Sequence, residues 1–319
     1  MSLKISHNVS LTIVALVAAV AFAAPGSAQA QTVNWDKVPA KKIVLMYPAQ
    51  TSWERLMTDK MHSGRGRFLT GKNCLSCHGD IDEKPLGSAL VKAERTKEPT
   101  PIPNKQGFLD VQVKTARDAQ NLYVRLEFDP GKQPNAGMDK DFETKVTMMF
   151  DDASVRDSDR AGCWITCHQD SASMPMGTDT VTKYLTQTRT PGGRGTLMPA
   201  DVLDPMRANG QFLEYWQARL NPGKPAVPVA GTILEKRVDD MQPGITTTAT
   251  QNSAGAWTVT FSRKLTGAGP GHKDIVPGKT YTVGFAVHAG YTAKRFHYVS
   301  FERTLVLDKG TADFVAASK

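Results

Sequence analysis

Hydrophobic and polar residues alternate along much of the chain after residue 107, a pattern typical of strands with one buried face. Turn residues separate these segments, for example at positions 129–131 and 252–255. Many strands of medium length joined by polar turns favour an antiparallel β-sandwich, so the fold is predicted to be mainly β. The predicted strands are residues 42–47, 109–114, 121–128, 144–151, 231–238, 245–250, 256–265, 281–288 and 296–307.

Helical periodicity is confined to short segments. Residues 51–62 are predicted to form a helix, because Ser52 can cap it and apolar side chains recur at helical spacing from Trp53 to Met61. A second helix is predicted at residues 211–220. It belongs to a stretch of about residues 152–230 that we interpret as a long insertion between strands of the sandwich, with helical and loop structure.

The N-terminus has the features of a secretory signal. Lys4 precedes an apolar run at residues 11–24, and residues 27–30 end in an Ala-x-Ala cleavage pattern. The alternative is a membrane anchor, but the run is short for a span. No arginine pair precedes the run, which favours the general secretory route and a location in the periplasm. We therefore expect a signal peptide at 1–30, an N-terminal haem c segment at 31–104 and a β-sandwich haem-binding domain at 105–319.

Two motifs contain all four cysteines of the chain. Residues 74–78 read Cys-Leu-Ser-Cys-His, and residues 163–168 read Cys-Trp-Ile-Thr-Cys-His. In c-type cytochromes the two thiols of such a motif bond to the vinyl groups of haem, and the histidine ligates the iron. The sequence thus predicts two covalently bound haem c groups. The predicted thioether residues are Cys74, Cys77, Cys163 and Cys167, and the predicted proximal iron ligands are His78 and His168.

Two other uses of the cysteine pairs are open. They can bind zinc, or form two disulfides in an exported protein. Neither use requires a histidine directly after both pairs, and a tetrathiolate zinc site has its four ligands without one. Haem attachment accounts for both the pairs and the histidines, although the second motif has a three-residue spacer in place of the usual two.

The remaining histidines are candidates for the distal ligands of the two irons. His297 shares a strand face with Val299 and Phe301, so it points toward apolar surroundings. His288 lies on the face of small residues in the strand 281–288, which leaves room for a flat macrocycle. His62 follows the predicted helix and precedes the first motif, whereas His272 is expected in an exposed loop. Methionine is an alternative ligand, and Met57, Met61, Met148, Met149, Met174 and Met176 are candidates.

The chain resembles the ethylbenzene dehydrogenase-related haem-binding proteins. The resemblance is carried by residues 47–53 and 149–152, by the two cysteine motifs, and by residues 182–185 and 295–300. That family is similar to the γ subunits of molybdenum enzymes related to dimethyl sulfoxide reductase, in which methionine and lysine hold a b-type haem. The resemblance implies a β-sandwich haem domain with a role in electron transfer. This chain differs in having two covalent attachment motifs, and His297 stands near the position where the γ subunits supply lysine.

The leading hypothesis is a periplasmic dihaem electron carrier rather than an enzyme. The formal charge of +8 fits either docking to an acidic redox partner or a merely soluble protein. The expected partners are a cytochrome, a quinol-linked donor or a molybdenum oxidoreductase, and not nucleic acid. The alternatives are a haem enzyme, such as a peroxidase or small-molecule reductase, and a ligand sensor with one open iron. No phosphate loop, metalloprotease motif or serine-hydrolase motif is present.

Overall fold

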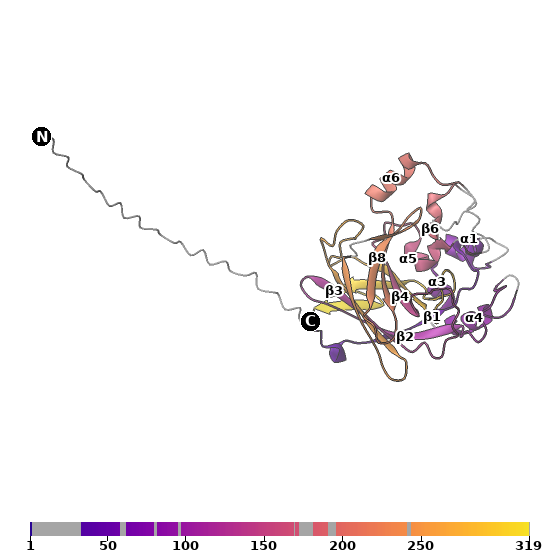
Figure 1. The fold of residues 1–319 in the computed structure, drawn as a ribbon. Helices are drawn as coiled ribbons and strands as arrows, with labels where there is room; N and C mark the ends of the chain where they lie inside the picture. The colour runs from indigo at the N-terminus through magenta and orange to yellow at the C-terminus, as the bar shows by residue number, and fades with distance from the viewer. Residues whose placement is uncertain are drawn as a thin grey trace. The chain divides into compact units, whose positions relative to one another are not determined.

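A computed structural model gives the fold of the chain (Figure 1). It describes Met1 and residues 33–57, 62–79, 82–94, 97–168, 170–171, 181–190, 196–240 and 244–318. The predicted signal peptide, the candidates Met61, Met174 and Met176, and the glycine-rich loop 192–195 lie outside the described residues. Residues 33–319 form one compact unit.

The architecture is mainly β, as the sequence predicts. One path of strands runs β10-β11-β3-β2-β1-β13-β12-β4-β7-β8-β9, and every pairing along it is antiparallel. β14 pairs with β12 and β15, and β15 pairs with β2. The strands of the large sheet are β1 (Lys41–Met46), β2 (Phe108–Arg117), β3 (Asn121–Phe128), β4 (Thr144–Asp151), β7 (Leu213–Leu220), β8 (Val227–Ile233), β9 (Arg237–Asp240), β10 (Ile245–Gln251), β11 (Trp257–Lys264), β12 (Tyr281–His288), β13 (Tyr298–Val299), β14 (Arg303–Leu307) and β15 (Phe314–Ser318).

The sheet folds over on itself like a sandwich. β10 and β11, at one end of the path, contact β7 and β8 near the other. Alternate residues of both halves meet in one apolar core, to which Leu126, Val259 and Trp216 belong. The strand β1 supplies Ile43 and Leu45 to the same core, so the N-terminal segment contributes directly to the sheet.

The strands β4, β7 and β12 are buried on both faces. Val146, Met148 and Phe150 of β4 point into the main core. Met149 belongs to a second apolar cluster on the opposite face, together with Trp164 of the second cysteine motif. This second face is the one that carries the candidate site.

Short helices lie along one side of the sheets, where α1, α3, α4 and α5 are seen together in Figure 1. Within the described residues, no helix is long and apolar enough to cross a membrane. A further two-stranded sheet is formed by β5 (Thr166–His168) and β6 (Lys183–Leu185). The helices are η1 (Trp35–Lys37), α1 (Trp53–Leu56), α2 (Arg65–Leu69), α3 (Cys74–His78), α4 (Glu83–Leu90), α5 (Ser158–Ala161), η2 (Gly162–Ile165), η3 (Thr186–Thr188) and α6 (Ala200–Ala208).

Most predicted strands are confirmed, but the helix predicted at residues 211–220 is wrong. That segment is the strand β7, paired with β4 and β8. Seven of its eight residues are buried, so apolar side chains occur on both faces, and Leu213, Trp216 and Leu220 coincide with helical spacing. The strand predicted at 231–238 is a hairpin of β8 and β9, and the one at 296–307 is interrupted between β13 and β14. In the segment 51–62, the described helix is limited to α1.

Candidate functional site

The first cysteine motif forms the helix α3. Asn73 caps it, because its side chain accepts a hydrogen bond from the Ser76 amide at 2.8 Å while the Ser76 hydroxyl accepts from the Asn73 amide at 3.1 Å. Residues three and four apart share a helix face, so Cys74, Cys77 and His78 lie on one side of α3. Cys77 is exposed, whereas Cys74 is partly buried.

The His78 ring lies between two other rings. Phe301 stacks on it with ring centroids 5.4 Å apart and planes 17° apart. The His62 ring lies 6.1 Å away at 30°. Burial, reinforced by His78, lowers the pKa of His62, which favours the neutral imidazole that metals bind. The structure therefore brings together the predicted proximal histidine of this motif and one distal candidate.

The buried carboxyl of Glu302 contacts the same helix. Its Oε1 accepts a hydrogen bond from the Leu75 amide at 2.9 Å. Burial raises the pKa of Glu302 to about 7. Burial also raises the pKa of the Cys74 thiol well above its ordinary value, with Glu302 contributing in the same direction. Burial thus favours the neutral form of both groups, and Glu302 loses its proton only near neutral pH.

The second cysteine motif runs from η2 into β5. Thr166 and His168 point to one side of β5, into a cavity that Cys163 also lines. Cys167 points to the other side and packs on Tyr184 in a small separate cluster. All four cysteines are described, and none forms a disulfide. Of the two cysteines and the histidine of this motif, Cys167 is therefore the one that does not line the cavity.

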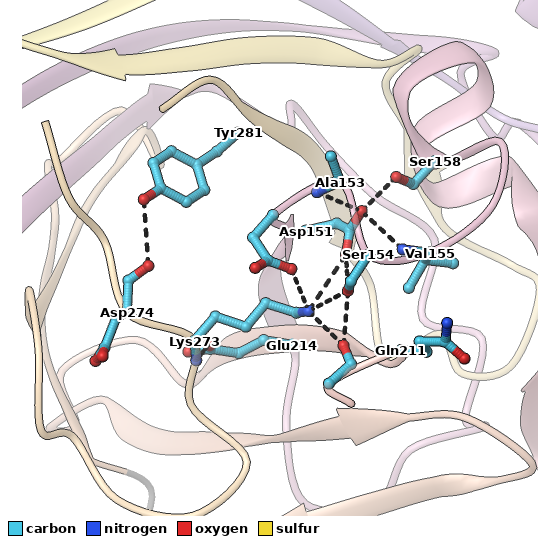
Figure 2. Close-up of polar contacts among 12 residues, drawn as sticks. Asp151, Ala153, Ser154, Val155, Ser158, Gln211, Glu214, Lys273, Asp274 and Tyr281 are labelled. Atoms are coloured by element: carbon cyan, nitrogen blue, oxygen red, sulfur yellow. Dashed lines mark hydrogen bonds and ion pairs between the residues drawn. The ribbon is translucent and has the colours of Figure 1, made fainter. Parts of the chain in front are cut away.

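A buried polar network holds the loop that leads into the second motif. Asp151, at the end of β4, accepts hydrogen bonds from the Ala153 amide, the Val155 amide and the Ser158 hydroxyl, as Figure 2 shows. Lys273 Nζ donates to Ser154 Oγ at 2.6 Å (Figure 2) and to Asp152 at 2.6 Å. Because α5 and η2 follow directly, this network fixes where Cys163 enters the cavity.

The cavity has a volume of about 370 Å³, within the usual range of small-molecule sites. Its floor is the face of β13, β12, β4 and β7 that points away from the main core. Residues paired across these strands lie side by side on this face and form rows. At the inner end, Cys163 Sγ lies against Gly284, where an added Cβ would be only 2.7 Å from the sulfur. Met149 and Tyr215 stand in the same row as Gly284, the next row is Val299, Ala286, Thr147 and Gln217, and the last row is His288, Lys145 and Arg219, with His297 beside His288.

Three histidines meet in this cavity. The rings of His168 and His297 have centroids 5.2 Å apart, and those of His297 and His288 lie 4.8 Å apart at 11°. Burial lowers the pKa of all three, that of His297 to about 3. Neighbouring cations add to the effect, above all Lys183 beside His168 and His297. Neutral imidazoles with available lone pairs are the form required of an iron ligand.

His297 and His288 differ in which ring nitrogen is occupied. His297 Nδ1 lies 3.0 Å from the Arg295 carbonyl, which leaves Nε2 available. His288 Nε2 lies 3.1 Å from the Lys294 carbonyl, while its Nδ1 is buried without a partner. A hydrogen bond from Nδ1–H to a backbone carbonyl is the common arrangement of a metal-binding histidine. The geometry thus favours His297 over His288 as a ligand.

A buried ion pair holds the segment that carries His297. Arg295 Nη1 donates to Glu98 Oε2 at 2.7 Å and to the Tyr47 hydroxyl at 3.0 Å. Arg295 Nη2 donates to Thr100 Oγ1 at 3.0 Å. Since the Arg295 carbonyl faces His297 Nδ1, these contacts fix the orientation of the imidazole ring.

The two motifs meet at the segment between β13 and β14. Phe301 stacks on His78 and also lies 6.1 Å from Trp164, which directly follows Cys163. Gly162 lies so close to Glu302 that a Cβ on it would be 2.9 Å from the Glu302 Cα. The first and second motifs therefore lie on the two sides of one short segment.

Other predicted residues fall elsewhere. His272 was expected in an exposed loop, but it is buried with its Nδ1 2.7 Å from Glu214 Oε1 and does not line the cavity. Met148 packs in the main core, whereas Met149 lines the cavity and Met57 packs beside the second cluster. Glu302 and the cationic residues of the last row have no local signal in the sequence, because only strand register and long-range packing bring them to the site.

Comparison with known proteins places the chain among haem proteins of one family. Residues 33–246 match the family model described as ethylbenzene dehydrogenase. The chain is 30% identical over 307 residues to cytochrome c-552 of Stutzerimonas stutzeri, covering 96% of this chain and 97% of that protein. It is also 30% identical over 287 residues to cytochrome c-551 of Rhodocyclus tenuis, covering 90% and 99% respectively.

Among solved structures, a family 9 carbohydrate-binding module from Caldicellulosiruptor kristjanssonii in complex with glucose matches 60% of this chain and 66% of its own chain. The TM-score is 0.29 at 14% identity. Similarity at this level supports no inference about fold or ligand.

Proposed function

This chain belongs to the ethylbenzene dehydrogenase family, and from that premise we propose that it is a dihaem c-type cytochrome carrying single electrons between redox partners in the periplasm. The curated relatives that it matches over nearly their full length are named cytochromes c. A cytochrome of this kind is an electron carrier, not an enzyme that converts a substrate. The single observation that supports it best is the meeting of Cys163, His168 and His297 in one cavity.

The residues of the second site fit a covalent haem. Cys163 lies above Gly284, and the small residues Gly284 and Ala286 leave space for a flat macrocycle. His168 and His297 would hold the iron, His297 through its Nε2. Cys167 would supply the second thioether, for which its side chain must turn out of the cluster with Tyr184.

The residues of the first site also fit such a group. Cys74 and Cys77 share a face of α3 with His78, the proposed proximal ligand. His62 is the proposed distal ligand, since its ring is the histidine ring next to His78. Exposed Cys77 marks the side on which this haem would be open to a redox partner.

Bound haem supplies the one-electron chemistry, and the chain's own residues set its potential and access. Glu98 and Arg295 hold the backbone carbonyl that orients His297. Phe301 packs between His78 and Trp164 and so excludes water from the space between the two motifs. We also propose that the chain is exported to the periplasm through the general secretory route.

The test is the absorption spectrum of the purified holoprotein with a pyridine haemochrome count. We expect two covalent haems per chain, no high-spin band and no band of methionine–iron ligation. His297→Ala should create a high-spin component at one haem, whereas His288→Ala should leave both low-spin. A wild-type spectrum with a high-spin component that binds cyanide, together with peroxide turnover, would instead support a haem enzyme. A single haem per chain would refute the dihaem proposal.

A further inference from the structure

The outer end of the cavity beside His297 is cationic. Lys145 of β4 and Arg219 of β7 are direct cross-strand neighbours in the last row of the floor. Exposed Lys294 adds a third cation at the mouth of the cavity, where its carbonyl faces His288. No function described above requires three cations in this place.

Lys145 and Arg219 already have partners, but each keeps at least one N–H group that can donate a further hydrogen bond. Lys145 Nζ pairs with Asp139 and donates to the Thr292 carbonyl at 2.9 Å, which leaves one N–H. Arg219 donates to Gln217 Oε1 and, with Nη2, to Asp239 Oδ2, both at 3.0 Å. Lys294 has no ion pair among the described residues. The charged groups that line the cavity are Lys145, Lys183, Arg219, Arg237, Lys294, Asp139 and Asp141, with Asp239 held between Arg219 and Arg237.

The groups on the floor follow a fixed order. Cys163 lies at Gly284, and His288 stands four residues further along β12, roughly 13 Å away at the usual rise of a strand. Small and apolar side chains come first, and the outermost row holds the histidines together with Lys145 and Arg219, which lie beside them across the sheet. In haem, the vinyl groups and the propionates lie at opposite edges with the iron between them. The cations therefore lie at the end of the floor opposite Cys163, as the propionates lie at the edge of haem opposite the vinyl groups.

We propose that Lys145, Arg219 and Lys294 bind the propionate carboxylates of the second haem. This assignment rests on the proposed function, because it requires a haem bonded at Cys163. Carboxylates paired with lysine or arginine form short, charge-assisted hydrogen bonds. With the thioether edge fixed at Cys163, only the outer end of the cavity remains for the propionates.

Lys183 provides a matched control within the same cavity. It lies directly opposite His168 in the β5–β6 pair, and its charge interacts with Cys163 and Cys167. It stands beside the proposed iron ligands His168 and His297 and is not a member of the Lys145–Arg219 pair. Lys183→Gln removes the same charge as Lys145→Gln and leaves that pair intact, so it separates a general effect of lost charge from an effect at the last row.

The experiment measures the midpoint potential of each haem between pH 5 and pH 9 in the wild-type holoprotein, in the Lys145→Gln, Arg219→Gln double variant and in Lys183→Gln. Loss of these cations should raise the pKa of the propionate carboxyls into the range of pH 5 to pH 9. The midpoint potential of one haem of the double variant should then depend on pH. Its reduction constant at pH 7 should also fall several-fold, where tenfold corresponds to 59 mV for one electron. Lys145→Arg with Arg219→Lys should restore the wild-type profile.

Three results decide the assignment. A new pH dependence in Lys183→Gln and none in the double variant would place the carboxylates beside Lys183 and overturn it. Unchanged profiles in both variants, with two reversible couples present, would overturn the assignment alone. Absence of a second covalent haem from the wild-type protein would overturn both the assignment and the proposed function.

Discussion

Glu302 should make the folded protein lose stability as the pH rises. The carboxyl is 2% exposed, its Oε2 is buried without a partner, and burial raises its pKa from 4.5 to about 7. Below pH 4.5 it is protonated in both the folded and the unfolded chain. Between pH 4.5 and 7 only the unfolded chain ionises, so the free energy of unfolding falls, and above pH 7 the loss is complete.

The size of the loss follows from the two pKa values. Each pKa unit is worth about 1.4 kcal/mol, so Glu302 should cost roughly 3 kcal/mol, most of it between pH 5 and pH 8. Glu302→Gln keeps an oxygen to accept the Leu75 amide but cannot ionise. Its free energy of unfolding should therefore fall less than that of the wild type over this range.

The assay is urea unfolding of the holoprotein at pH 5 and pH 8, followed by circular dichroism. Asp308→Asn is a suitable control. The Arg117 partner lowers the pKa of the Asp308 carboxyl, so that this group is ionised throughout the range from pH 5 to pH 8. The control should behave like the wild type between pH 5 and pH 8. Equal pH dependence in the wild type and Glu302→Gln would refute the reasoning.

Three further predictions concern packing and capping. Gly284→Ala should reduce loading of the second haem, because the new methyl would lie 2.7 Å from Cys163 Sγ, and two haems per chain by pyridine haemochrome would contradict this. Glu83→Ala should cost about 3–5 kcal/mol in urea unfolding, because it removes the buried carboxylate 3.0 Å from the Arg303 guanidinium, a closer partner than Asp313 at 3.8 Å, and a loss below 1 kcal/mol would contradict it. Asn73→Ala should cost about 1 kcal/mol by removing the cap of α3, and Asn73→Ser should retain most of that stability.

Strands bounded by clear turn residues were predictable, including β4 and β12, whose two faces are both buried, whereas β7 was not. β12 has the predicted bounds, because turn residues flank it and its composition is typical of a strand. β7 was predicted as a helix, because Tyr215 on its cavity face is followed directly by Trp216 on its core face, which interrupts the alternation of apolar and polar residues. The break between β13 and β14 has no local signal, since it arises from the packing of Glu302 against α3.

The candidate ligands show the same division. The two cysteine motifs are local, so the sequence alone identifies them. That His297 shares a cavity with His168 depends on the register of β12 and β13 and on the fold of the loop after β4, which are long-range. The cations Lys145 and Arg219 become neighbours only through the β4–β7 pairing, and no spacing in the sequence indicates it.

The most direct test of the central claim is a potentiometric titration of the purified holoprotein, followed in the visible absorption bands. We predict two reversible one-electron steps that together account for both covalent haems, with a change in potential of only one step in His297→Met. A protein that shows no reversible step would contradict the account of an electron carrier.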